Sequence, residues 1–124
     1  MSPKAKHDLA RDHLERALPA VTSEDYTEAV TWLFAALEAA VVSLAERYGR
    51  DTQRLHWKKA EAAQEMYSEG LLSHDFSRTL AILNRARKVA IYEGDEPDLS
   101  PYSLEDVASD VTAAVELAER EAAA

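Results

Sequence analysis

The sequence YTEAVTWLFAALEAAVVSLAERY, at residues 26–48, decides the fold of this chain. Its apolar side chains recur in steps of three and four residues over about six turns, which is the period of one helix face. Gly49 follows directly and is a residue type that often closes a helix, while Thr22 or Ser23 can cap its start. The stretch therefore predicts a long central helix. Its apolar positions are Tyr26, Val30, Leu33, Phe34, Leu37, Val41, Leu44 and Tyr48.

Four further helices are expected around it, each marked by an apolar stripe and by residues that start or stop helices. The first is predicted over about residues 4–18, before Pro19, and the third is expected to be capped by Asp51 or Thr52. Ser73 or Asp75 should cap a fourth that runs to about Tyr92, and Ser103 with Asp106 forms an approximate capping box for a fifth. With short connections and no strand pattern, the expected fold is all-α, a five-helix up-down bundle.

Length and composition point to one small domain. The 124 residues suffice for one core, and the chain has no Cys, which excludes disulfides and thiolate metal sites. The N-terminal residues carry no apolar signal segment, and the apolar stretch over 30–45 is interrupted by Thr31, Glu38 and Ser43, so it is too short and too polar to cross a bilayer. We expect a cytoplasmic protein with no membrane partner.

The charge is unevenly distributed along the chain. The net charge is −9, and residues 89–124 hold ten acidic residues against one basic residue. Residues 47–88 instead hold nine basic residues against five acidic ones. An acidic chain binds polyanions poorly without a local basic surface, and the middle helices are the place where such a surface is expected.

Two charged residues occupy positions where the helix pattern expects apolar ones. Glu38 lies in the most apolar helix, and Arg87 continues the stripe that starts with Phe76, Leu80 and Leu83. An unpaired buried charge is costly, and the planar guanidinium of Arg binds carboxylate with two hydrogen bonds. The spacing therefore predicts a structural Glu38–Arg87 ion pair or an Arg87 whose guanidinium reaches the surface, with a functional pocket around it as the alternative.

Two basic clusters surround aromatic residues. Arg85, Lys88 and Tyr92 share one face of the fourth helix, because they are three, four and seven residues apart. Arg54, His56, Lys58 and Lys59 surround Trp57 near the start of the third helix. A solvated face with Trp57 packed inward is expected for this cluster, and the alternative is that basic side chains beside the aromatic ring hold a phosphate and stack a nucleobase.

No metal site or cofactor is expected. None of the four His residues is three or four positions from another, and the acids of 93–98 do not follow the spacing of a calcium-binding loop. The sequence also has no glycine-rich phosphate loop and no nucleophile motif.

Three segments together resemble the HEPN superfamily, small all-α domains of prokaryotic toxin–antitoxin, defence and nucleotide-handling systems. They are the apolar helix 26–48, the segment 52–59 with its Thr, His and Lys, and the run RKVAIYEG at 87–94. The resemblance covers roughly residues 20–120, and it implies that residues 1–124 are a single HEPN-like domain in which 1–19 is an accessory helix. The acidic loop and final amphipathic helix follow as in small members of the superfamily.

Active HEPN ribonucleases carry an Arg followed after four to six residues by His. Arg87 matches that Arg, but the residue that follows after four others is Tyr92, and no His occurs after His74. A phenol is a poor general base at neutral pH. The resemblance therefore implies a homodimer that binds a nucleotide, RNA or a partner protein without catalysis, using Arg85, Arg87, Lys88, Tyr92, Arg54 and Lys58.

Two other functions stay open from the sequence. One is a metal-independent ribonuclease in which Arg87 holds the phosphate and His56 or Tyr92 moves the proton. The other is an interaction subunit whose acidic C-terminal third meets a basic partner. A cognate toxin, antitoxin or nucleotidyltransferase is the kind of partner that the resemblance implies.

Overall fold

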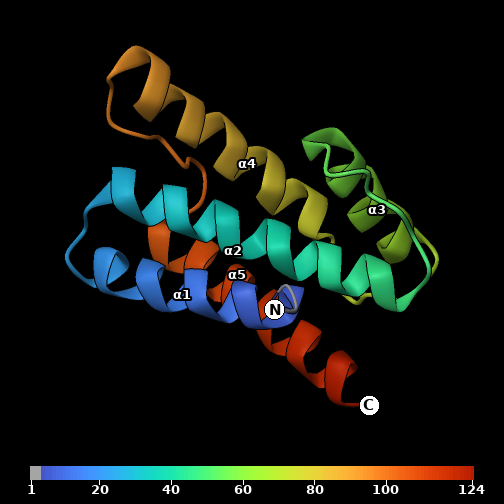
Figure 1. The fold of residues 1–124 in the computed structure, drawn as a ribbon. Coiled ribbons are helices and arrows are strands. Elements are labelled where there is room, and N and C mark those ends of the chain that lie inside the picture. Colours follow the sequence, from blue (N-terminus) through green and yellow to red (C-terminus); the bar gives the residue numbers. More distant parts are fainter. Residues whose placement is uncertain (1–3) are drawn as a thin grey trace.

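The computed structural model describes residues 4–124, which form five α-helices and a short π-helix with no strand (Figure 1). The all-α prediction is confirmed. The helices are α1 (Lys6–Thr22), α2 (Tyr26–Arg47), α3 (His56–Ser68), α4 (Phe76–Lys88) and α5 (Leu104–Ala123), with the π-helix η1 (Val89–Glu93) continuing α4.

The central helix is α2, which packs against all four other α-helices. Figure 1 shows α1 along one side of α2, α4 along another, and α3 beside its C-terminal half. Leu33, Leu37, Val41 and Leu44 are fully buried, and each buried side chain of this size contributes about 1.5–3 kcal/mol. By length and composition α2 resembles a membrane span, but 61% of its most apolar window is buried inside the bundle. Its apolar surface is therefore accounted for by helix packing.

The first helix runs further than the sequence suggested. Pro19 was expected to end it, but α1 continues to Thr22. Proline in a helix interior removes one hydrogen bond and costs about 3 kcal/mol. Here Pro19 and Glu15, whose carbonyl loses its donor, are both exposed to water, and Ala20 beyond the proline is buried in the core. Burial of the last turn and hydration of the free carbonyl offset the cost.

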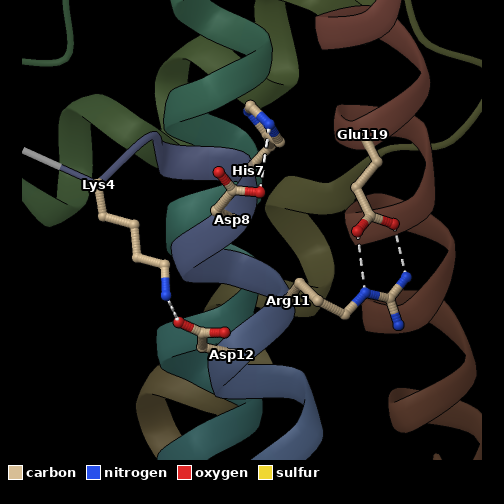
Figure 2. Close-up of polar contacts among 6 residues, drawn as sticks. All are labelled: Lys4, His7, Asp8, Arg11, Asp12 and Glu119. Carbon is tan, nitrogen blue, oxygen red and sulfur yellow. Dashed lines mark hydrogen bonds and ion pairs between the residues drawn. The ribbon is translucent and has the colours of Figure 1, made fainter.

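Residues 4–19, which the resemblance sets apart as accessory, share one hydrophobic core with the rest of the chain. Ala10, Leu14 and Ala17 of α1 are fully buried against α2 and α5. The guanidinium of Arg11 makes two hydrogen bonds to Glu119 of α5, at 2.9 and 2.6 Å (Figure 2). The first helix is thereby fastened to the last.

The helix starts were predicted with mixed success. Asp75 caps α4 by accepting from the backbone N–H of Ser77 at 3.0 Å, and Ser103 caps α5 in a full capping box with Asp106, so both predictions are confirmed. The cap of α2 is Asp25, two or three residues after those expected, and its side chain accepts from the N–H of Glu28.

The prediction that Asp51 or Thr52 caps the third helix is wrong. Asp51 Oδ1 accepts from the backbone N–H of Gln53 at 2.8 Å, which closes a turn instead of a helix. Gln53 and Arg54 then adopt left-handed φ angles of 51° and 59°. Because that conformation stops a right-handed helix from starting, α3 begins only at His56.

Candidate functional site

A groove of about 380 Å³ lies between α2, α3 and α4. This hollow is the α3–α4 groove. Its volume lies within the range of small-molecule sites. The central helix contributes Phe34 and Glu38 to it. The other lining residues are His56, Trp57 and Ala60 of α3 and Leu80, Ala81, Asn84 and Lys88 of α4.

The groove continues onto the outer surface of α4. Arg85, Lys88 and Tyr92 line a neighbouring hollow of about 420 Å³, which shares Ala81, Asn84 and Lys88 with the groove. The stripe expected from the helical spacing is therefore one surface, with Tyr92 76% exposed at its far end on η1. Basic side chains from this stripe reach the edge of the groove at Lys88.

Glu38 has different partners from the one predicted. Its Oε2 contacts His56 Nδ1 and lies 3.5 Å from Lys59 Nζ, and its side chain is only 13% exposed. Within residues 4–124 no ion pair joins Glu38 to Arg87, so the expected structural pair is not formed. The start of α3 supplies two basic side chains to this carboxylate, which leaves Arg87 without it.

Arg87 is stabilised by an aromatic ring instead of a carboxylate. Its guanidinium carbon lies 4.8 Å from the centroid of Phe34, and Nη2 donates to Asn84 Oδ1 at 3.1 Å. Its Nε is buried and has no hydrogen-bond partner among the described residues. A cation–π contact attracts the charge but does not neutralise it. Arg87 thus keeps a positive charge with no carboxylate partner, in contact with Phe34 and Asn84 of the groove wall, although its own side chain lines neither hollow.

His56 is brought to the same ring from another helix. Its ring centroid lies 5.6 Å from that of Phe34, so Arg87 and His56 are both neighbours of one aromatic side chain. If Nδ1 carries the hydrogen donated to Glu38, Nε2 is left as a free acceptor. Sequence reasoning could not place His56, because the approach depends on how α3 packs against α2.

The remaining candidates are separated. Lys58 Nζ lies 4.8 Å from the Trp57 ring, and Trp57 is 59% exposed, so the expectation that this ring packs inward is wrong and the stacking alternative remains. Arg54 instead lines a separate hollow with Lys6, Glu46 and Lys59. The left-handed turn before α3 accounts for this separation, since it breaks the helical register that placed Arg54 beside Trp57.

Sequence reasoning missed Phe34 and Asn84 as parts of the site. Both had a signal: Phe34 precedes Glu38 by four residues, and Asn84 precedes Arg87 by three and Lys88 by four, so each shares a face with a candidate. Asn84 orients the guanidinium of Arg87 through a hydrogen bond, and the ring of Phe34 packs against it.

Comparison with models of known protein families, with curated proteins and with solved structures finds no match to this chain. The groove itself is therefore the basis for a function, and the resemblance to the HEPN superfamily stays a prediction.

Proposed function

We propose that this protein binds a nucleotide or a short stretch of single-stranded RNA in the α3–α4 groove, without catalysis. The observation that carries the proposal is Arg87, whose guanidinium lies beside the groove with no carboxylate partner in residues 4–124. An anionic ligand supplies the missing counter-charge.

The other groups around the groove suit the rest of a nucleotide. Lys88 and Arg85 offer ammonium and guanidinium groups to phosphate, and the exposed ring of Trp57 offers a stacking surface for a base. Basic residues in the last turn of α4 also complement its helix dipole, so their presence alone does not require a ligand. The half-buried Arg87, which has no carboxylate partner in residues 4–124, does favour one, because partial desolvation of its charge is unfavourable without a counter-charge.

The acidic character of the chain limits the size of the ligand. The net charge of −9 repels a long polyanion, while a ligand with a few phosphates remains near the basic stripe. A mononucleotide or a short single strand therefore fits better than a duplex.

Binding of a fluorescent RNA oligonucleotide, followed by anisotropy, tests the proposal. If Arg85 and Lys88 each neutralise one phosphate, they contribute about −1.4 to the slope of log K against log salt concentration. This corresponds to a loss of about sevenfold in affinity between about 50 and about 200 mM salt. The double variant Arg85→Ala with Lys88→Ala should lose that part of the slope, and Arg87→Met should weaken binding with the fold intact.

The matched control is Arg54→Ala with Arg120→Ala, which removes the same charge from exposed residues outside the groove. Equal weakening by both double variants would show a nonspecific charge effect. Absence of any RNA or ATP binding at low salt would leave the interaction-subunit hypothesis in its place.

The contact between His56 and Glu38 favours a second candidate, metal-independent ribonuclease activity at the same groove. In that reaction His56 Nε2 takes the proton of a ribose 2′-hydroxyl, the 2′-oxygen bonds to phosphorus, and the 5′-oxygen leaves and is protonated by water. The products are a 2′,3′-cyclic phosphate and a 5′-hydroxyl. Cleavage in the presence of a chelator that disappears with His56→Ala would establish it.

We also propose a HEPN-like up-down bundle that forms a cytoplasmic homodimer through the α4 face. Ile91 and Tyr92 on η1 are 52% and 76% exposed, so two consecutive large side chains are available for such a contact. Sedimentation should then report about twice the monomer mass of 13.8 kDa, and a monomer at micromolar concentration would exclude the shared interface.

A further inference from the structure

A second cavity lies where α3 ends and where α4 and α5 begin. Its volume is about 180 Å³, similar to engineered cavities of about 150 Å³ that hold benzene. The residues that line it come from three helices and two connecting segments. None of them lines the α3–α4 groove, so the proposed function does not use this cavity.

A fixed carboxylate lines the cavity. Asp110 Oδ2 accepts from the hydroxyl of Thr79 at 3.3 Å and lies 3.4 Å from His74 Nε2. Thr79 is only 3% exposed, and the His74 ring packs 4.9 Å from that of Phe76, so both neighbours of the carboxylate are held in place. The other oxygen, Oδ1, accepts no side-chain hydrogen bond within residues 4–124.

A guanidinium lines the same cavity without pairing to that carboxylate. Arg78 forms no ion pair with any of the described residues, including Asp75 and Asp110, which are the two acids of the cavity. Direct contact between two opposite charges in one small cavity would be electrostatically favourable. Because they stay apart, Arg78 and the remaining oxygen of Asp110, Oδ1, can each meet an opposite charge from a ligand.

The walls between the charged groups are aromatic and aliphatic. Tyr67 and Tyr102 are 44% and 41% exposed at the rim, and Ile82 and Val107 complete the apolar lining. The cavity thus combines apolar walls with converging polar and charged groups, and both features are found in small-molecule sites.

We infer that this cavity binds a small zwitterion of the size of a free α-amino acid. The ammonium group pairs with Asp110, the carboxylate with Arg78, and the side chain packs between Tyr67 and Tyr102. A ligand with one charge would leave either Asp110 or Arg78 unmatched, which makes the pair of charges selective for a molecule that carries both.

Thermal unfolding and calorimetry with each standard amino acid at about 10 mM test this inference, because a ligand that binds only the folded state raises Tm. At least one amino acid should bind. If its side chain is uncharged, its decarboxylated amine and its deaminated acid each keep one charge and should bind at least about tenfold more weakly.

Variants then locate the site. Asp110→Asn and Arg78→Gln should each weaken binding at least about tenfold, while Arg120→Gln, an exposed position on α5 away from the cavity, should leave it unchanged. Arg78 is exposed, so its variant is readable even if Asp110→Asn does not fold. The inference is overturned if no standard amino acid binds, or if the amine binds as tightly as the amino acid.

Discussion

Arg87 is the only charged residue on the inner face of α4. Replacing it by Met distinguishes stabilisation by Phe34 and Asn84 from stabilisation by an ion pair with Glu38. The change removes a cation–π contact with Phe34 worth about 1 kcal/mol and a hydrogen bond to Asn84 worth about 1 kcal/mol. It also removes the buried Nε, whose missing hydrogen bond costs about 1–3 kcal/mol. Met keeps the packing of the stem against Phe34. We therefore expect the free energy of unfolding to change by no more than about 1 kcal/mol.

The ion pair expected from the sequence gives a different magnitude. Removing one partner of a buried pair costs about 3–5 kcal/mol, because the other charge remains buried alone. Urea unfolding of Arg87→Met, of Glu38→Gln and of the double variant measures both quantities. We expect a coupling energy below about 0.5 kcal/mol, since Glu38 contacts His56 and Lys59 instead. A loss above about 3 kcal/mol with Arg87→Met, or strong coupling to Glu38, would refute this assignment of partners.

Three further predictions concern the bundle. Arg11→Gln and Glu119→Gln should show a coupling of about 1 kcal/mol in a double-mutant cycle at low salt, because the contact has two hydrogen bonds but is partly exposed. Those hydrogen bonds lower the pKa of Glu119 from 4.5, so the stability that the contact adds is present above pH 4.5 and should fall as the pH drops through the lowered pKa. Measuring the free energy of unfolding against pH in acid checks this. The same pH profile in Arg11→Gln as in the unchanged protein would contradict it. Burial, and then the charge of Arg16, lower the pKa of His13 from 6.5, so the free energy of unfolding should decrease as the pH falls below 6.5. In urea unfolding, His13→Gln should reduce this dependence of the free energy on pH. Leu37→Ala, at a fully buried position of α2, should cost about 2–5 kcal/mol, and a loss under about 1 kcal/mol would argue against the central place of this helix.

Helix identity could be predicted from the sequence because it depends on local periodicity. The apolar steps in α2, the cap at Asp75 and the capping box at Ser103 all act within a few residues, and each is found as expected. The errors fall where a local signal competes with tertiary packing. Pro19 is tolerated because buried residues on either side continue the helix, and Asp51 forms a turn where a cap was equally possible.

The site was less predictable because its contacts cross helices. The stripe of Arg85, Lys88 and Tyr92 lies on one helix, and its spacing alone shows that these side chains share a surface. The partners of Glu38 come from α3, whose start depends on two left-handed residues that no apolar pattern reveals. Glu38 and Arg87 have opposite charges, so a pair between them was a reasonable prediction. In the structure the basic residues His56 and Lys59 lie nearer to Glu38 and are its partners.

The sharing of Phe34 by Arg87 and His56 links the two candidate activities of the groove. Binding without catalysis needs only the positive charge of Arg87 and the neighbouring Lys88, whereas cleavage also needs His56 Nε2 to reach a ribose hydroxyl. Glu38 holds the opposite ring nitrogen, so the orientation of His56 is fixed before any ligand enters. Substituting His56 should therefore leave phosphate binding largely intact while removing any cleavage, and substituting Arg87 should weaken both. The two residues touch one ring, yet their variants distinguish a binding groove from a ribonuclease site.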